Sequence, residues 1–262
     1  MKYIEDKRIF IIDILGIIYK LYYIYNNFFF FHFEKYLKKK IINYNPNNLI
    51  IVFDTRLKYN YKKNIYSFYK NNRKKNIFIK KNIYKIYKIL KKYKIFYIYK
   101  KGYEADDLIA NYVTYFKQKN YIIYIISNDK DFFKLLSNNI YICNYNGNII
   151  DKYYVLFFYK ITSIKKIIDI NVLSGDYSDN INGFKNIGLK KSIYFINKYK
   201  SLYNILKKNN INNYLLNIIL NNKNKISINY KLLSFENINI INNINLYKFN
   251  ILFFLKKYFN YD

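Results

Sequence analysis

The stretch IFYIYKKGYEADDLIANYVTYFKQKNYIIYIISNDKD, residues 95–131, decides the fold class. It contains two apolar runs, Ile95–Tyr99 and Tyr121–Ile126, whose length and content of β-branched and aromatic residues are typical of buried strands. Between them, Glu104–Lys117 carries apolar residues at helical spacing. A strand, a helix and a second strand in this order indicate a parallel α/β sheet with helices on its faces.

Two more apolar runs extend this pattern toward the N-terminus. Arg8–Asp13 and Leu49–Phe53 predict strands, while Ile17–Phe31 and Ile83–Tyr93 predict helices. We therefore expect an α/β fold with a mainly parallel central sheet flanked by helices. An acidic residue closely follows each expected strand. Because binding sites of open α/β sheets lie outside the carboxyl ends of the strands, these acids are expected to converge.

Nine of the sixteen acidic residues form four sets along the chain. Acids brought close together repel one another unless cations lie between them. The chain has one histidine and one cysteine, so a site built from its acids offers hard oxygen ligands, which suit Mg²⁺ or Mn²⁺. Two such ions can stabilise the attacking and leaving oxygens of a phosphoryl displacement. The expected metal ligands are Asp13, Asp54, Glu104, Asp106, Asp107, Asp129, Asp131, Asp176 and Asp179, and the spacing of the last two predicts one face of a helical turn.

The charge of the chain favours a polyanionic partner. Lysine and arginine total 46 against 16 acids, giving a formal net charge of +30, which attracts nucleic acid or an anionic membrane surface. Lys, Asn, Ile, Tyr and Phe are abundant, and these are also the residues that A/T-rich codons encode. The high positive charge alone therefore does not establish a polyanionic partner. Residue types that run against this bias are more informative. Five of the six glycines lie in or beside the acidic motifs, and both alanines lie within residues 104–110.

The chain divides into two expected regions. Residues 1–150 predict the catalytic core, including a basic and aromatic segment, about 58–94, that is either a phosphate-tracking surface or a solvated pair of helices. Residues 151–262 predict a mostly helical region, which becomes a DNA-binding region only through the family resemblance given below. Within it, glycines and lysines at an expected helix start predict a helix–hairpin–helix over about residues 175–200, whose main-chain amides hold a phosphate. Its residues are Gly183, Gly188, Lys190 and Lys191.

The order of these motifs resembles a known family of nucleases. The motifs are Asp13, Phe53-Asp54, Tyr69-Lys70-x-x-Arg73, Gly102-Tyr-Glu-Ala-Asp-Asp107, Asn128-Asp-Lys-Asp131 and Gly175-Asp-x-Ser-Asp-Asn180. They are similar to the 5′–3′ nuclease domain of bacterial DNA polymerase I, to stand-alone phage 5′ nucleases and, more distantly, to flap endonucleases. The resemblance covers nearly the whole chain. It implies a free-standing nuclease with a PIN-like core, a helical arch over about residues 58–94 and a helix–hairpin–helix lobe.

The resemblance also implies a role for each matching residue. The nine acids would hold two Mg²⁺ ions, directly or through waters, and Mn²⁺ would substitute. Lys20, Lys70 and Arg73 would balance charge on the scissile phosphate, and Tyr69 would place its ring near an unpaired base. The residues that would grip the duplex backbone, with a K⁺ ion on main-chain carbonyls nearby, are Gly183, Gly188, Lys190 and Lys191.

Several positions depart from the family pattern. The expected Asp-Gly reads Asp13-Ile-Leu-Gly16, Asn182 stands where proline is usual, and Asn186 stands where glycine is common. Lys20 stands where relatives usually carry arginine, which removes a bidentate fork but keeps the positive charge. These changes predict weaker DNA binding with every metal ligand intact.

We therefore expect a 5′–3′ exonuclease and structure-specific 5′ flap endonuclease that hydrolyses DNA phosphodiesters in primer removal or repair. Two alternatives stay open: a DNA-binding protein whose catalytic site is impaired, and a PIN-type ribonuclease. The expected partners are DNA with a free 5′ end or a 5′ flap and, in the same process, a separate DNA polymerase and ligase. The chain is expected to act as a monomer.

The N-terminus does not predict export. Glu5 and Asp6 occupy the region that is basic in a signal peptide. The apolar run Leu21–Phe33 is too short to span a membrane and is interrupted by polar residues, so no membrane association is expected. The expected location is the cytoplasm of an A/T-rich bacterium, at the nucleoid, or alternatively an organelle.

Overall fold

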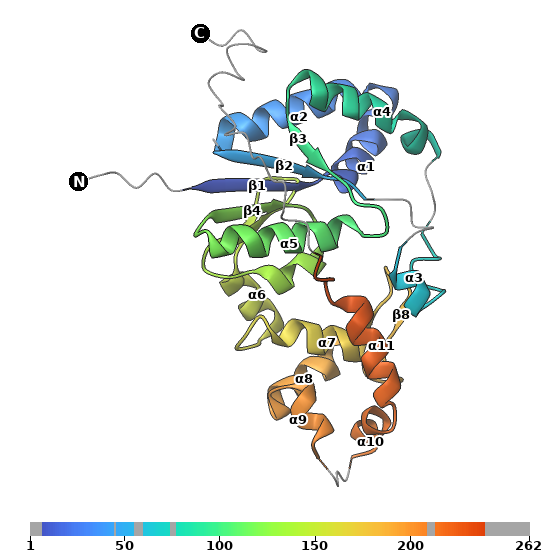
Figure 1. Ribbon diagram of the computed structural model, residues 1–262. Helices are drawn as coiled ribbons and strands as arrows, with labels where there is room; N and C mark the ends of the chain where they lie inside the picture. Colours follow the sequence, from blue (N-terminus) through green and yellow to red (C-terminus); the bar gives the residue numbers. More distant parts are fainter. Residues whose placement is uncertain (1–6, 45, 55–59, 74–76, 209–212, 239–262) are drawn as a thin grey trace, which may run out of the picture.

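In the part of the chain that the structure describes, six strands form one central sheet (Figure 1). The computed structural model describes residues 7–44, 46–54, 60–73, 77–208 and 213–238. The sheet is parallel throughout except where its last two strands pair in antiparallel fashion. Its spatial order is β3 (Phe96–Ile98), β2 (Asn48–Val52), β1 (Arg8–Asp13), β4 (Ile122–Ile126), β5 (Ile140–Cys143) and β6 (Ile149–Ile150). The predicted fold class is confirmed.

Both faces of the sheet are buried, because side chains of a strand alternate between its two faces. In β1, Phe10 and Ile12 pack into a core shared with α1 (Ile14–Tyr25), α2 (Phe29–Tyr44) and α4 (Ile77–Lys92). Ile9 and Ile11 join a second core that includes α5 (Ala105–Gln118). Figure 1 shows α1, α2 and α4 on one side of the sheet and α5 on the other. No helix within the described residues is long and apolar enough to cross a membrane.

The predicted helix Ile17–Phe31 proved to be parts of two helices. Asn26 adopts a positive φ of 45° at the end of α1, and a short 3₁₀ turn, η1 (Asn26–Phe28), follows before α2 begins. Asparagine tolerates this backbone conformation better than most residues. The long helix α2 then buries Phe33, Leu37 and further residues at four-residue spacing, a stripe that the sequence prediction did not include.

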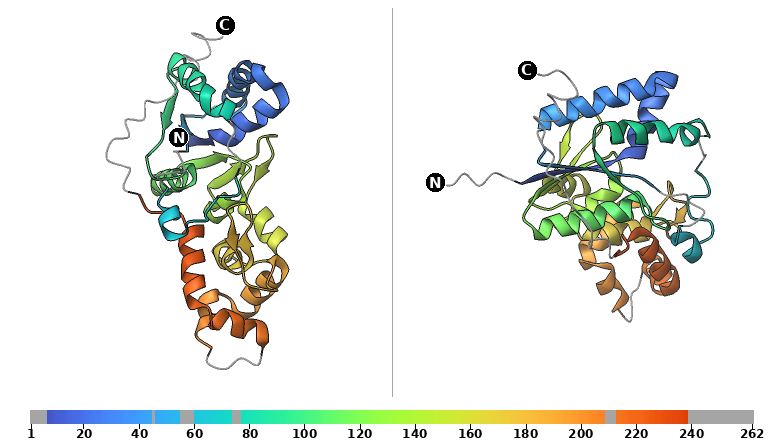
Figure 2. Two further views of the ribbon diagram at one scale, coloured as in Figure 1. Left: turned by 90° about the vertical axis from the view of Figure 1, so that its right-hand side faces the viewer. Right: turned by 45° about the horizontal axis from the view of Figure 1, so that its top comes forward.

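A helical lobe follows the sheet. It is built from α6 (Lys152–Tyr159), α7 (Lys166–Ser174), α8 (Leu189–Tyr199), α9 (Leu202–Leu206), α10 (Tyr214–Leu220) and α11 (Lys223–Leu233). Both views of Figure 2 show the orange and red helices of this lobe on the side of the sheet away from α2 and α4. Helices expected within residues 151–262 are thus present in the described residues, while residues 209–212 and 239–262 lie outside them.

Between α7 and α8, the chain forms a small hairpin of β7 (Gly175–Asp176) and β8 (Ile181–Asn182). The predicted helical turn through Asp176 and Asp179 was therefore wrong. The side chain of Asp176 accepts hydrogen bonds from the backbone N–H (2.8 Å) and hydroxyl (2.7 Å) of Ser178. An aspartate that bonds the backbone two residues later favours a turn over a helix.

Candidate functional site

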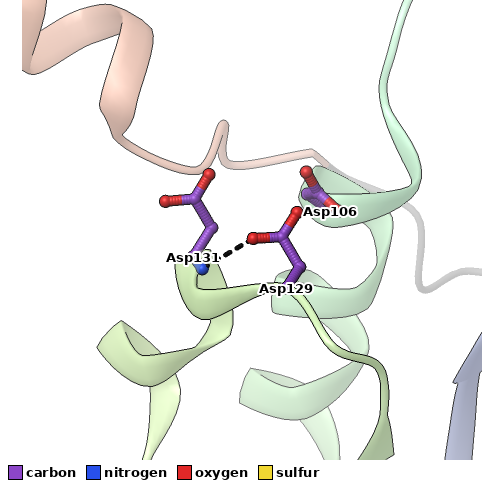
Figure 3. Close-up of side chains that lie close together, drawn as sticks. All are labelled: Asp106, Asp129 and Asp131. Carbon is purple, nitrogen blue, oxygen red and sulfur yellow. Dashed lines mark hydrogen bonds between the residues drawn. The ribbon is translucent and has the colours of Figure 1, made fainter. Parts of the chain in front are cut away.

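The acidic residues gather where strands β1, β2 and β4 end. Asp13 is the last residue of β1, Asp54 lies just beyond β2, and Asp129 follows β4. Asp129 caps the 3₁₀ helix η3 (Lys130–Leu135), and one of its carboxylate oxygens accepts the backbone N–H of Asp131 at 2.8 Å. Figure 3 shows Asp129 and Asp131 beside Asp106, which comes from the first turn of α5. The predicted convergence of acids at this edge of the sheet is thus present in the fold.

Five of these acids make two groups in which one carboxylate oxygen of each member lies within 4.8 Å of the others. Three hard oxygens at this separation suit a cation such as Mg²⁺, Mn²⁺ or Ca²⁺, and the groups contain neither histidine nor cysteine. Asp131 belongs to both groups, so two adjacent cation sites would share it. The first group is Asp106, Asp129 and Asp131, and the second is Asp131, Asp176 and Asp179.

The crowding of acids changes their affinity for protons. Burial, and then the nearby charge of Asp131, raise the pKa of Asp129 to about 6. Burial and Asp129 likewise raise the pKa of Asp106 well above its ordinary value. Such shifts mark carboxylates whose negative charge is poorly compensated by the protein alone. A divalent cation would supply that compensation.

Asp13 and Asp54 lie beside these groups but are not members of them. Ser127 donates its hydroxyl hydrogen to Asp13 Oδ2 at 3.0 Å, and burial and Asp54 raise the pKa of Asp13 to about 7. The backbone N–H of Ala105 donates to Asp54 Oδ1 at 2.6 Å, which places that carboxylate at the N-terminus of α5. Asp54 is thus close to Asp13 on one side and to the start of α5 on the other.

Glu104 and Asp107 are engaged by other groups of the protein. Glu104 Oε1 lies 2.6 Å from Lys70 Nζ, and Glu104 Oε2 lies 3.4 Å from Lys62 Nζ. Burial alone would raise the pKa of Glu104, but Lys70 and Lys62 hold it below its ordinary value. Asp107 accepts the backbone N–H of Glu236 at 2.9 Å and lies 3.8 Å from Lys62. In this arrangement both carboxylates stabilise the N-terminal end of α5.

The segment that contains Lys70 and Arg73 contacts the β7–β8 hairpin directly. The backbone N–H of Lys70 donates to the carbonyl of Asp179 at 2.9 Å, and Arg73 pairs with Asp179 Oδ1 at 2.6 Å. Lys70 is 5% exposed, and Glu104 and Asp179 keep its pKa above the ordinary value although burial lowers it. The cationic side chains of Lys70 and Arg73 therefore lie at the edge of the acidic site, against Asp179 of its second group.

Tyr69 does not offer a ring for base stacking. Its side chain is fully buried, and its hydroxyl lies 2.9 Å from both Glu104 and Asp179. The sequence predicted a Tyr69 ring near an unpaired base; in this structure the hydroxyl instead satisfies two buried carboxylates while the ring joins the core around α5. The predicted arch is described only as α3 (Lys62–Ile65), residues 66–73 and α4, since residues 55–59 and 74–76 lie outside the described residues.

Lys20 lies on α1 and points to the β5–β6 connection instead of the acids. Its Nζ donates to Asn146 Oδ1 at 2.7 Å and lies 6.0 Å from the centre of the Tyr145 ring. The same tyrosine packs against Gly16, where an added Cβ would meet its hydroxyl. The glycine that the sequence carries at position 16 thus makes room for Tyr145 close to Asp13, whose charge is one cause of the raised pKa of that tyrosine after burial.

The expected helix–hairpin–helix residues surround the turn between β8 and α8. Gly183 approaches the backbone of Ser174 and Gly175 so closely that a Cβ would overlap it, whereas Gly188 has open space. Gly188 precedes α8, Lys190 is exposed in its first turn, and Lys191 donates to the carbonyl of Asn186 at 2.9 Å. Asn186 has a φ of 62°, which explains how asparagine replaces the glycine common at this position.

Two buried or half-buried lysines were missed by the sequence prediction. Lys62 is 4% exposed between Glu104 and Asp107, and Lys134 lies 3.0 Å from Asp131. Lys62 stands in a segment full of lysines, so no local signal separates it from its neighbours. Lys134 follows Asp131 by three residues, a spacing that places two side chains on one face of a helical turn. That spacing was the available signal.

The comparisons with known proteins identify the family of this chain. A family model described as 5′–3′ exonuclease, N-terminal resolvase-like domain, matches residues 8–161, and one described as 5′–3′ exonuclease, C-terminal SAM fold, matches residues 162–249. A 5′–3′ exonuclease of Buchnera aphidicola is 32% identical over 79% of this chain and 77% of its own length. DNA polymerase I of Borreliella burgdorferi is 32% identical over 88% of this chain but only 27% of its own length.

Among solved structures, a flap endonuclease of bacteriophage T5, in a pseudo-enzyme-product complex with DNA and metal ions, has the same fold. Its TM-score is 0.70 at 17% sequence identity, with 86% of this chain and 88% of that chain covered. The family models together span most of the sequence, and the Buchnera relative matches most of both chains. The chain belongs to the 5′–3′ exonuclease family and is a nuclease of that family.

Proposed function

We propose that this protein is a Mg²⁺-dependent 5′–3′ exonuclease and 5′ flap endonuclease that hydrolyses DNA by a two-metal mechanism. The observation that carries the proposal is Asp131, whose carboxylate belongs to both groups of acids at the end of the sheet. A carboxylate that belongs to both groups can be shared by two ions a few ångströms apart, the arrangement of a two-metal site. Mn²⁺ would substitute for Mg²⁺, because both accept oxygen ligands.

The ligands of the two ions are assigned by their place in the fold. Asp106, Asp129, Asp131, Asp176 and Asp179 would hold the ions directly, and Asp13, Asp54, Glu104 and Asp107 would act through waters or by orienting α5. When bound, the ions supply the positive charge that stabilises the attacking and the leaving oxygens of an in-line displacement. Ser127 keeps Asp13 oriented toward the site.

Cationic side chains would handle the scissile phosphate. Lys70 and Arg73 already lie against Asp179 and can donate hydrogen bonds to a phosphate that enters beside it. Arg73 is the better placed of the two, since its side chain is 42% exposed while that of Lys70 is 4% exposed. Lys20 would add charge from α1 once its bond to Asn146 is exchanged for the substrate.

The helical lobe would hold the duplex beside the cleavage site. Backbone groups around Gly183 and Gly188 and the side chains of Lys190 and Lys191 would contact phosphates, with a K⁺ ion on main-chain carbonyls of this turn. The products would be 5′-phosphorylated nucleotides or short flaps, released during primer removal or repair in cooperation with a separate polymerase and ligase. We propose that the protein is a monomer and that it acts at the nucleoid. The relatives come from bacteria, which supports a place in the bacterial cytoplasm.

One experiment tests this function against its alternatives. The full chain is incubated with 5′-labelled flap DNA, blunt duplex and single-stranded RNA, each with Mg²⁺ and with EDTA, beside the Asp176→Ala variant. We expect Mg²⁺-dependent cleavage of the flap by the wild type, and DNA binding without cleavage by the variant. Binding without cleavage by the wild type would instead indicate an impaired enzyme. Cleavage confined to RNA would indicate a PIN-type ribonuclease.

A further inference from the structure

Lys134 is a lysine with two polar partners at the edge of the acidic site. Its Nζ lies 3.0 Å from Asp131 Oδ1 and donates to the carbonyl of Leu233 at 2.7 Å. The same ammonium group lies 4.6 Å from the centre of the Phe235 ring. Its side chain is 10% exposed, so the charge is largely removed from water and depends on these partners. A lysine in this position faces the one carboxylate that belongs to both groups of acids.

The segment that follows α11 keeps Lys134 in place. This segment, residues 233–238, runs along α5, where Asn111 donates to the carbonyl of Glu236 at 2.7 Å and accepts the backbone N–H of Ile238 at 2.9 Å. The ring of Phe235 stacks on Phe132 of η3 at 6.2 Å. Because the carbonyl and the ring that hold the ammonium group belong to an anchored segment, Lys134 has little freedom to leave Asp131.

We propose that Lys134 is a positioning residue that acts as an internal counter-charge for Asp131. It stabilises the protein without metal, and it weakens the affinity of the shared site for divalent cations, because a fixed positive charge opposes a second one nearby. The inference rests on the proposed two-metal function. It concerns how strongly this particular chain binds its ions, and it predicts opposite effects of the charge on the metal-free and the metal-bound protein.

The test compares Lys134→Gln and Lys134→Arg with the wild-type full chain. Mn²⁺ affinity is measured by calorimetric titration without DNA, and the midpoint of thermal unfolding is measured in EDTA and in saturating Mn²⁺. The matched control is Lys225→Gln, because Lys225 Nζ also donates to a carbonyl, that of Gly183, at 2.7 Å and lies 5.1 Å from a Phe184 ring centre. The control lysine therefore has the same kinds of partner except the carboxylate.

We expect Lys134→Gln to lower the Kd for Mn²⁺ by at least about threefold, the size expected for removal of one partly screened charge. Its unfolding midpoint should fall in EDTA and gain more from Mn²⁺ than that of the wild type, since tighter binding to the native state adds stability. Lys134→Arg and Lys225→Gln should keep the wild-type Kd. If Lys134→Gln is unfolded in EDTA, recovery of its fold by Mn²⁺ supports the proposal, and failure to recover overturns it.

Two other results would also overturn the proposal. An unchanged or weaker Mn²⁺ affinity of Lys134→Gln means that Lys134 only anchors the segment 233–238. An equal tightening in Lys134→Arg means that charge is not the cause. Failure of the proposed two-metal site, on which the inference rests, looks different, because the wild type itself would then bind no Mn²⁺.

Discussion

The carboxyl groups of Asp13 and Asp129 contribute to how the stability of the metal-free protein changes with pH. Burial and neighbouring carboxylates raise the pKa of Asp13 to about 7 and that of Asp129 to about 6, from an ordinary value of 3.8. Between the ordinary pKa and these raised pKa values, the folded chain binds more protons than the unfolded chain. The free energy of unfolding therefore decreases as pH rises through this range. Above about pH 7 both states have lost these protons and this contribution becomes constant.

We therefore expect the unfolding midpoint in EDTA to fall as pH rises from about 4 to about 7. Asp13→Asn should make the fall shallower, because the amide cannot ionise. Mn²⁺ affinity should rise over the same range as protons leave the ligands. Thermal unfolding at constant ionic strength measures the first effect, and an unfolding midpoint that instead increases over this range would contradict it.

The contact between Gly16 and Tyr145 can be tested at the start of α1, where the sequence Asp13-Ile-Leu-Gly16 departs from the family pattern. An added methyl group would overlap the hydroxyl of Tyr145, so Gly16→Ala should destabilise the protein by about 1–3 kcal/mol through overpacking. Tyr145→Ala in the same chain should remove most of that cost, which is a measurable coupling between two contacting residues. Denaturant unfolding of both single variants and the double variant gives the coupling. Strictly additive losses would show that the two residues do not interact.

At the residue scale, the sequence predicted the positions of the acidic side chains better than those of the lysines. The apolar runs of the sequence define where strands β1, β2 and β4 end, and an acidic residue stands at or just after each end. Asp13, Asp54 and Asp129 could therefore be placed near one another. The neighbours of Lys62 depend on how α3 packs, and nothing local distinguishes this lysine in a basic segment. The burial of Tyr69 was missed for the same reason, since an aromatic residue between lysines can face either way.

The β7–β8 hairpin is the element that brings two of the proposed ligands, Asp176 and Asp179, into the acidic site. Gly175 has a φ of 76°, and Gly183 lies against the backbone of Ser174 and Gly175. Backbone atoms cannot yield as a flexible side chain can, so a Cβ at residue 183 must spread the hairpin. Asp176 and Asp179 lie on this hairpin and its turn, so their position depends on the close approach of the two glycines.

Gly183→Ala should accordingly weaken Mn²⁺ binding and lower the unfolding midpoint. Gly188→Ala is the matched control, because an added methyl group meets nothing within 4 Å and the φ of Gly188 is −84°. That control should keep both values. Calorimetric titration and thermal unfolding of the two variants decide the point, and equal behaviour of the two would argue against a structural role for the Gly175–Gly183 contact.

At the element scale, strands were easier to predict than breaks in helices. The four predicted strands agree with β1–β4 to within about two residues, because continuous apolar runs bounded by polar residues leave little choice. The end of α1 at Asn26 is set by a single residue with positive φ, and apolar residues continue on both sides of it. The short strands β5 and β6 depend on pairing with each other and with β4, which a sequence does not show.

At the scale of the whole molecule, the formal charge of +30 should make DNA binding strongly dependent on salt. If Lys190 and Lys191 each contact a phosphate, replacing both with glutamine should reduce the slope of log K against log salt by about 1.8. Lys117 and Lys119 at the far end of α5 serve as the control pair, and their replacement by glutamine should leave the slope unchanged. Binding of duplex DNA in EDTA over a salt series measures both slopes.

Equal slopes for the two double variants would mean that the charge acts as a diffuse field without a contact surface at α8. This distinction matters because an A/T-rich genome also produces many lysines, and composition alone could not separate the two explanations. The fold favours a contact surface at α8. This helix belongs to the lobe, the acidic site lies at the sheet edge, and the β7–β8 hairpin connects the two.

The central claim is that the acids hold two divalent ions that share Asp131. Equilibrium dialysis against Mn²⁺, with the bound metal counted per chain, tests it most directly in the wild type and in Asp131→Asn. We expect two ions per wild-type chain and at most one in the variant, with the fold of the variant checked by thermal unfolding. One ion or none in the wild type, or two in Asp131→Asn, would contradict the claim.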